Sequence, residues 1–455
     1  MREGSENNVN TELIVKSSMT MKNMIKKAHF LSFLLLLFFQ PALLSAQEAF
    51  PSEQFIYMDY IRSVKFYTEG LFLSYPIIEL GGAGRVTLAF DDIDGDTKDY
   101  FYKVVHCDRD WKPSQLAELE YVEGYTEERL QNFQFSFKTL WPYTHYELTL
   151  PNRDTRFTKS GNYLLFIYDD TYDRQLVLTR RFVVVDPKVT IAPRVLRASQ
   201  VSKFRTHQEI DFVVNHEQFK IQNPMLEVRA TVLQNGRWDN AITDVPPKFI
   251  RSNSLLFDHQ DLVVFPGGKE FRFLDLRSFR LVSYNIYSVE RTDDGFVVQL
   301  KYDEPRSGQS YTTFNDLDGN FVIETTDQPD NQLSAEYADV VFYLKKPQPY
   351  YGEEVYLFGG LTDWTILPEY RMEYDENLGA YVGQALLKQG YYDYGYATLP
   401  LPANDKKDKK PLPDLTEIEG TWHETENQYT ILIYYRPFGS RYDQVIGSVS
   451  FTSNL

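Results

Sequence analysis

Short aromatic and β-branched runs, closed at each end by turn residues, are the feature that most limits what this chain can fold into. Among its 455 residues are 33 Tyr and 32 Phe, and few windows keep a helical period beyond two turns. The runs that fit strands are residues 85–90, 100–106, 133–137, 163–168, 180–185, 210–215, 227–234, 296–302, 338–344, 354–358 and 429–435. Turn signals recur about every ten residues. The pattern predicts a mainly β fold of tandem antiparallel β-sandwich domains, immunoglobulin-like or early-set in type.

The N-terminal region has the pattern of an export signal. Three lysines between residues 22 and 27 precede an apolar run at 30–39, and the tripeptide at 44–46 (LSA) offers a small-residue cleavage site. The apolar run is too short to cross a bilayer core of roughly 30 Å. Residues 1–46 are therefore assigned to a signal peptide with upstream residues, and the mature protein is expected outside the cytoplasm.

Charge and cysteine content exclude several kinds of partner. The formal net charge of −17 disfavours nucleic acid and anionic lipid, because binding phosphate groups requires clustered Lys and Arg. The one basic run, at 406–410, lies among Pro and Asn and is typical of a solvated loop. Cys107 is the single cysteine, so stability must come from ordinary packing without an intramolecular disulfide.

Changes in pattern along the chain suggest three domains after the signal. The first spans residues 47–189 and ends after Asp186-Pro187, where a strand pattern gives way to a connection. The second spans 190–337 and contains several Gly-centred turns. The third spans 338–455, and a Lys- and Pro-rich spacer at 345–349 follows its first predicted strand.

Two Asp-rich segments have the composition of calcium loops. Residues 91–99 gather several carboxylates, and residues 315–320 repeat the chemistry. The spacing does not match an EF-hand, and a hairpin turn between the strands at 85–90 and 100–106 explains the first segment better. No metal ligand or cofactor is predicted.

No catalytic constellation stands out in the sequence. The chain has no HExxH pair, no GxSxG elbow and no phosphate-binding Gly-rich loop. A pair of glycosidase carboxylates is left open by the 64 acidic residues. The expectation is a protein that is not an enzyme.

The third predicted domain resembles the glycogen-binding or early-set β-sandwich modules attached to starch enzymes. The resemblance rests on residues 355–364 (VYLFGGLTDW), Arg371-Met372, 379–382 (GAYV) and 390–394 (GYYDY). It implies Trp364 as the candidate platform for a sugar ring, although a core position for this residue is equally open. The chain departs from that family at 397–400, where a second platform aromatic is usual.

Taken whole, the chain resembles the plug proteins of the type IX secretion system of Bacteroidetes. The stretches that carry the resemblance, in order, are 73–80 (LSYPIIEL), 90–96 (FDDIDGD), 102–108 (YKVVHCD) with Trp111, 142–146 (PYTHY), 160–163 (SGNY), 206–212 (THQEIDF), 234–241 (QNGRWDNA), 265–268 (FPGG) and 434–443 (YYRPFGSRYD). The resemblance implies a periplasmic protein, peripherally associated with the outer membrane, that reversibly closes a very large translocation barrel without inserting into the membrane itself.

Loops carrying aromatic or Arg residues are the candidate contacts with such a barrel, because those residues dominate interface hot spots. The candidates are Phe265, Pro266, Gly267, Gly268, Arg436, Phe438, Arg441 and Tyr442. Plain loops remain the alternative interpretation for each. Two other functions are weighed: a carbohydrate-binding protein of an envelope glycan-uptake system, and an outer-membrane barrel. The barrel is disfavoured because runs such as 182–185 are apolar on both faces and several predicted strands are short.

Overall fold

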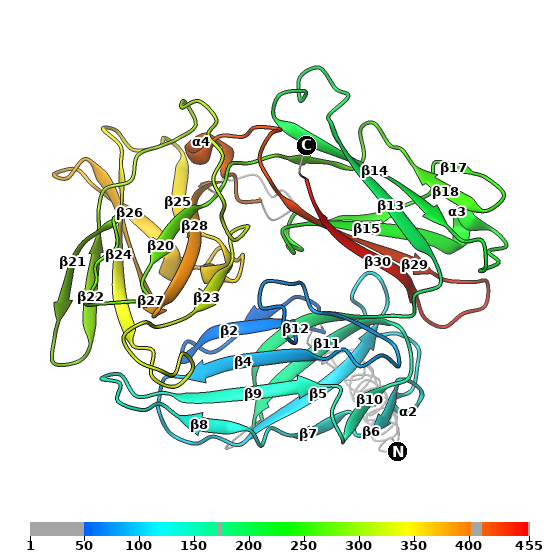
Figure 1. Ribbon diagram of the computed structural model, residues 1–455, viewed down its shortest axis with the longest axis horizontal. Coiled ribbons are helices and arrows are strands. Elements are labelled where there is room, and N and C mark those ends of the chain that lie inside the picture. Colours follow the sequence, from blue (N-terminus) through cyan, green and yellow to red (C-terminus); the bar gives the residue numbers. More distant parts are fainter. Residues whose placement is uncertain (1–49, 171–173, 402–411, 454–455) are drawn as a thin grey trace, which may run out of the picture. The chain divides into compact units, whose positions relative to one another are not determined.

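Strands dominate the structure, a computed structural model that describes residues 50–170, 174–401 and 412–453 (Figure 1). Several antiparallel sheets confirm the predicted mainly β class. The predicted signal peptide at 1–46 and the basic run at 406–410 lie outside the described residues. Within the described ranges, no helix has the length and apolar character needed to span a membrane.

Two facing sheets form the first body, here called the N-terminal sandwich. One sheet has the order β1-β12-β11-β5-β7 with β3 parallel to β12, and the other has the order β2-β4-β9-β8. The first sheet and its flanking pieces are β1 (Phe55–Ile56), β12 (Gln175–Val185), β11 (Gly161–Asp169), β5 (Tyr100–Cys107), β7 (Glu127–Arg129), β3 (Ile77–Glu79), the pair β6 (Val122–Gly124) and β10 (Thr155–Phe157), and α2 (Glu118–Tyr121). The second sheet contains β2 (Ile61–Thr68), β4 (Val86–Asp92), β9 (Thr144–Leu150) and β8 (Phe133–Phe135).

The core of the N-terminal sandwich lies between these sheets. Leu88 and Phe90 of β4 pack with Val104 of β5 and Leu165 of β11 in one buried cluster. Burial alternates along β5, as expected for a strand with one face toward the core. Every residue of β4 is buried, so its second face must also be covered.

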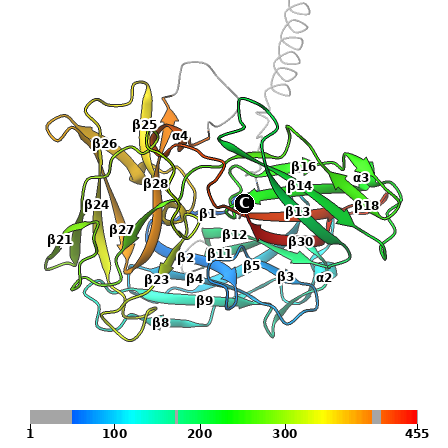
Figure 2. The same cartoon turned by 45° about the horizontal axis from the view of Figure 1, so that its top comes forward.

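Two further sheets form the middle sandwich. Its sheets have the orders β13-β14-β18-β17, with β19 on β14, and β16-β15-β29-β30. The elements are β13 (Thr190–Arg197), β14 (His207–Asn215), α3 (Pro224–Glu227), β15 (Val228–Gln234), β16 (Ile242–Val245), β17 (Phe249–Ile250), β18 (Ser254–Phe257), β19 (Val264–Pro266), β29 (Gln428–Tyr435) and β30 (Gln444–Thr452). Figures 1 and 2 both show the red β30 beside the green β13.

The remaining strands form one nine-stranded sheet around its own core. Its order is β20-β28-β25-β26-β27-β24-β22-β21, with β23 on β28. The elements are β20 (Arg272–Asp275), β21 (Ile286–Arg291), β22 (Phe296–Leu300), β23 (Phe321–Ile323), β24 (Tyr337–Lys345), β25 (Glu353–Phe358), η1 (Gly360–Thr362), η2 (Pro368–Tyr370), β26 (Arg371–Asp375), β27 (Ala380–Lys388), β28 (Gly390–Pro400) and α4 (Thr416–Glu419).

Every run predicted as a strand overlaps an observed strand, but strand pairing crosses the predicted boundary at 337/338. β20 to β23, all before that boundary, belong to the nine-stranded sheet with β24 to β28. β29 and β30 return to the middle sandwich, where Ala230 pairs with Ile433. A division into consecutive segments cannot represent such a return, because turn signals mark where strands end and not which strands pair.

A buried polar network joins the N-terminal sandwich to the nine-stranded sheet. One carboxylate oxygen of Asp91 on β4 contacts Lys388 Nζ on β27 at 2.7 Å and accepts a bond from the Tyr337 hydroxyl at 2.7 Å. Its other oxygen lies 2.6 Å from His145 Nδ1. Lys388 and His145 together outweigh burial and hold the pKa of Asp91 below its ordinary value. This contact covers the second face of β4.

We expect Lys388→Met to lower the free energy of unfolding by about 3 kcal/mol or more, because it leaves the Asp91 carboxylate buried without its counter-ion. Asp91→Asn in the same chain should restore part of the loss, since the remaining group is then neutral. Lys345→Met, which removes a solvent-exposed pair with Glu304, should cost less than about 1 kcal/mol. Urea unfolding of the variants checks this. Equal losses for the two lysine variants would contradict it.

Candidate partner-contact site

The loop between β29 and β30 presents the most exposed of the predicted contact residues. The amide of Ser440 donates to the carbonyl of Pro437 at 3.0 Å, which closes a tight turn. Gly439 stands in that turn at φ +81°, a conformation that favours glycine. The turn leaves the Phe438 side chain fully exposed, with a relative exposure of 102%. We therefore describe residues 437–440 as the loop tip.

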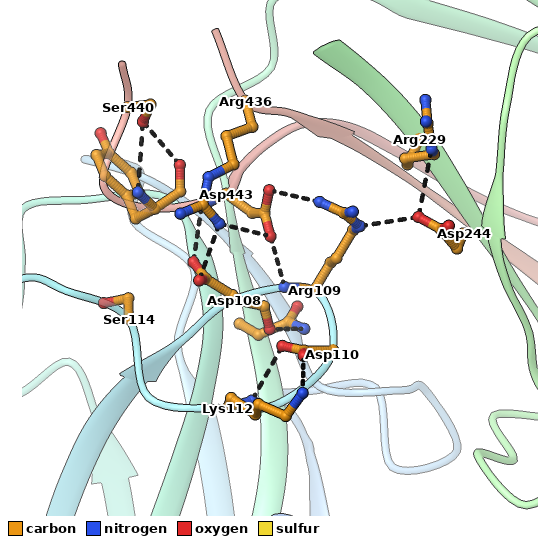
Figure 3. Close-up of polar contacts among 12 residues, drawn as sticks. Asp108, Arg109, Asp110, Lys112, Ser114, Arg229, Asp244, Arg436, Ser440 and Asp443 are labelled. Atoms are coloured by element: carbon orange, nitrogen blue, oxygen red, sulfur yellow. Dashed lines mark hydrogen bonds and ion pairs between the residues drawn. The ribbon is translucent and has the colours of Figure 1, made fainter. Parts of the chain in front are cut away.

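Ion pairs fix the base of this loop to the N-terminal sandwich (Figure 3). Arg436 Nη1 lies 2.9 Å from one carboxylate oxygen of Asp108, which follows β5. The other oxygen of Asp108 accepts a bond from the amide of Asp443 at 3.0 Å. The two ends of the loop are thereby held by a single carboxylate of another sandwich.

Asp443 is the centre of the same network. Its carboxylate accepts bonds from the backbone amide and from Nη1 of Arg109, both at 3.0 Å, and the side chain is 2% exposed. Arg109 also binds Asp244 of β16 at 3.0 Å, and Asp244 contacts Arg229 at 3.3 Å. Burial lowers the pKa of Arg109, but the charges of Asp443 and Asp244 outweigh it and raise that pKa above its ordinary value.

The C-terminal half of the loop makes a second attachment. Arg441 forms an ion pair with Glu120 of α2, and the Arg441 carbonyl accepts a bond from the Gln115 amide at 3.3 Å. The Tyr442 ring packs edge-on against His106, with ring centroids 5.4 Å apart. Burial lowers the pKa of His106 to about 4, so this imidazole is neutral near pH 7. Arg441 and Tyr442 are thus structural anchors of the loop.

Two short helices that contact the loop each carry an exposed leucine. Figure 1 shows the red loop between α3 and α2. The Arg436 amide donates to the Glu227 carbonyl of α3 at 2.8 Å, and Arg441 pairs with α2 as described. Leu226 of α3 is 73% exposed and Leu119 of α2 is 86% exposed. Phe438, Leu119 and Leu226 are here called the apolar tip set.

The second predicted contact loop, residues 265–268, lies largely inside the middle sandwich. Phe265 is buried and packs against Tyr429 at 5.5 Å between ring centroids. A Cβ on Gly267 would lie 1.9 Å from the Trp422 carbonyl oxygen, so only glycine fits there. Of this segment, Pro266 alone is exposed. Its aromatic residue packs in the core and is not available to a partner in the folded state.

The predicted sugar platform, Trp364, is half-buried between other side chains. The Arg237 guanidinium lies 4.9 Å from the centre of its ring, and Phe358 and Phe271 meet it edge-on. The remaining surface of Trp364 lines a cleft of about 420 Å³ together with Trp238. Side chains of the protein itself therefore already contact the Trp364 ring.

A lysine occupies the centre of the first Asp-rich segment. Lys98 Nζ lies 2.8 Å from Asp92, 2.7 Å from Asp94 and 3.2 Å from Asp96, so the ammonium stands among the carboxylates. The segment is a turn, but the predicted hairpin is wrong, because β4 and β5 belong to different sheets. In the described part of the chain, no group of three or more His, Cys, Asp or Glu side chains is placed to hold a metal ion.

The second Asp-rich segment brings two partly buried carboxyl groups, Asp316 and Asp318, near the buried carboxyl group of Asp393 on β28. One oxygen of Asp393 accepts bonds from the Leu317 and Gly319 amides, the latter at 3.2 Å, and burial raises its pKa to about 7. Burial raises the pKa of Asp316 to about 6 and that of Asp318 to about 7. These groups are therefore protonated at a pH where ordinary carboxyls are charged.

Two comparisons with known proteins indicate the family of this chain. The family model of the type 9 secretion system plug protein first domain matches residues 61–186. A crystal structure of a hypothetical protein from Parabacteroides merdae superposes with a TM-score of 0.82 at 32% identity, and covers 88% of this chain and 98% of that one. The chain belongs to the type 9 secretion system plug protein family.

Two other crystal structures align with this chain at TM-scores too low to indicate a shared fold. Trypsin-activated α2-macroglobulin from Escherichia coli is 8% identical with a TM-score of 0.15, and the alignment covers 85% of this chain and 23% of the macroglobulin chain. The collagen adhesin of S. aureus is 9% identical with a TM-score of 0.10, and the alignment covers 86% of this chain and 91% of the adhesin chain. No curated protein matches this member of the plug family.

Sequence reasoning selected the loop of this plug-family protein but missed most of the network that holds it. Arg109, Arg229 and Asp244 were not singled out, because isolated charges in loops and strand ends look like solvated surface. Asp108 and Asp443 each end a stretch that carries the family resemblance, 102–108 and 434–443. Their location at the ends of two such stretches is the sequence feature from which their contact could have been predicted.

Arg436 Nη1 also lies 3.5 Å from Asp443 Oδ2, so Arg109 and Arg436 share this buried carboxylate. We therefore expect Asp443→Ala to lower the free energy of unfolding by about 2 kcal/mol or more. Hydrogen exchange in residues 436–443 should accelerate in the same variant. Asp110→Ala, which removes an exposed pair with Lys112, should leave both quantities nearly unchanged. Unaltered exchange in the loop of Asp443→Ala would show that the network does not hold it.

The raised pKa of Asp393 gives a pH prediction. Its folded value of about 7 exceeds an unfolded value of about 4, so the folded state binds the extra proton and this group's contribution to stability falls as pH rises from about 4 to about 7. Asp393→Asn should therefore stabilise the protein more at pH 8 than at pH 4, by at least about 1 kcal/mol. Urea unfolding at both pH values measures the difference. A variant effect independent of pH would contradict it.

Proposed function

We propose that this protein is a non-catalytic periplasmic plug that reversibly closes the outer-membrane translocation barrel of the type IX secretion system. Its membership of the plug protein family carries the proposal. A barrel wide enough for folded cargo would leak solutes when empty, so a folded stopper that can dissociate is required. A chain built of three packed β bodies supplies a stopper that keeps its form.

The loop tip suits a reversible contact. Phe438 is exposed on a turn whose base is held by Asp108 and Asp443, so little conformational entropy remains to be lost when the ring is buried by a partner. Aromatic anchors of this kind dominate binding energy, and a small interface with a polar rim allows release. We place the contact with the barrel at the apolar tip set.

Carbohydrate binding is the second candidate, and one observation favours it. The cleft of about 420 Å³ beside Trp364 and Trp238 also contains Glu53 and Asp239, and aromatic rings with nearby carboxylates suit a sugar. Against it, Arg237 already lies over the Trp364 ring. The plug function therefore stands first.

A pull-down of the tagged mature protein from its native envelope in mild detergent tests both functions. We expect the parent protein to retain a giant outer-membrane barrel, identified by mass spectrometry. Phe438→Ala should reduce the recovered barrel at least tenfold, equivalent to about 1.4 kcal/mol. Tyr351→Ala is the matched control, because Tyr351 is also 102% exposed but lies on the turn between β24 and β25.

The outcomes separate the site from the function. Undiminished recovery with Phe438→Ala would remove the loop tip from the contact while leaving the plug function in place. Recovery of glycan-uptake components by the parent protein, or of no barrel, would overturn the plug function and favour carbohydrate binding.

A further inference from the structure

A small polar cavity lies where the three β bodies meet. Its volume is about 100 Å³. The N-terminal sandwich contributes Lys65 of β2 and Arg180 of β12, the middle sandwich contributes Asn235 and Gln428, and the nine-stranded sheet contributes Asp363 after η1. Such a volume admits a small polyatomic ion but not a nucleotide or a sugar chain.

Arg180 is the least satisfied charged group of this cavity. Its side chain is 4% exposed, and Nη1 donates to the Thr179 carbonyl at 2.9 Å. Nη1 also forms an ion pair with Asp363 Oδ2 at 3.1 Å, whereas Arg180 Nη2 has no hydrogen-bond partner among the described residues. A buried guanidinium nitrogen without an acceptor is costly, so the geometry calls for one more oxygen.

Lys65 adds a second positive charge beside the same carboxylate. Its Nζ donates to the Phe321 carbonyl at 2.9 Å, which uses one of the three ammonium hydrogens. Burial lowers the pKa of Lys65 to about 8, opposed by the charge of Asp363. Arg181 also lines the cavity, but its guanidinium donates to the Ser52 carbonyl and lies over Trp111.

The charge of the cavity is therefore unbalanced. Asp363 is the one acidic residue among the described residues that line it, and it faces both Lys65 and Arg180. Burial also raises the pKa of Asp363, which weakens its ability to compensate. Two cations that share one carboxylate in a low-dielectric site leave a surplus positive charge.

The backbone that carries Asp363 is held in an uncommon conformation. Asp363 and Trp364 follow one another at φ +53° and +55°, in the left-handed region that side-chain-bearing residues seldom adopt. Their amides donate to the Gly360 and Gly359 carbonyls, both at 3.0 Å. Strain of this kind persists at sites that bind a ligand or are tightly constrained.

We propose that this cavity binds a small inorganic oxyanion of the phosphate or sulfate class. Its oxygens accept bonds from Arg180 Nη2 and from Lys65 Nζ, and its charge balances the surplus. Guanidinium and ammonium groups recognise tetrahedral oxyanions in this way. Because residues of all three bodies line the cavity, the bound ion stabilises their junction. The proposal does not depend on the plug function.

Calorimetric titration of the mature protein with sodium phosphate, and separately with sodium sulfate, tests the proposal against sodium chloride at equal ionic strength. We expect a saturable signal for one or both oxyanions and a rise in the thermal midpoint that chloride does not produce. Arg180→Met should weaken the affinity at least tenfold. Arg85→Met, which removes an exposed arginine paired with Glu69, is the matched control and should bind normally.

Lys65→Met keeps the test decisive if Arg180→Met does not fold, and it should also weaken binding. Absence of a saturable signal for both oxyanions would overturn the proposal, as would equal affinities for the parent and both cavity variants. Retention of binding by Arg85→Met together with its loss in either cavity variant would establish the site.

Discussion

The Asp91 carboxylate is the constraint on which the arrangement of the β bodies depends. It lies on a strand that is buried on both faces, and its counter-ion, Lys388, comes from a strand 297 residues further along the chain. A buried ion pair tolerates little displacement, because separating the charges leaves each one buried without a counter-ion and without water. The pair therefore ties β4 of the N-terminal sandwich directly to β27 of the nine-stranded sheet.

Local sequence patterns predicted the elements better than their assembly. Tyr and Phe alternation identified strands such as β5 and β29 because each buries one or both faces in a core. β2 escaped prediction, since Arg62 and Lys65 interrupt its apolar pattern and contact Glu369 and Phe321 of the body that contains the nine-stranded sheet. The partner of β15 was not predictable, because β-pairing depends on long-range burial that no local signal encodes.

The candidate site shows the same limit. The turn at residues 437–440 could be predicted from Pro, Gly and Ser, and its structure explains the exposure of Phe438. Phe265 has the same residue type beside Pro and Gly, yet it lies in a core, because Tyr429 of a distant strand packs on it. Two similar sequence motifs thus have opposite exposure, and tertiary contacts alone decide which one a partner can reach.

The return of β29 and β30 to the middle sandwich has a consequence for biogenesis. β15 pairs with residues 429–435, so about two hundred residues must be synthesised before its central neighbour exists. Until then β15 and β16 have an open edge and an unclosed core, the state in which β proteins aggregate most readily. Any truncation before residue 428 removes β29 and β30, the strands that complete this sandwich.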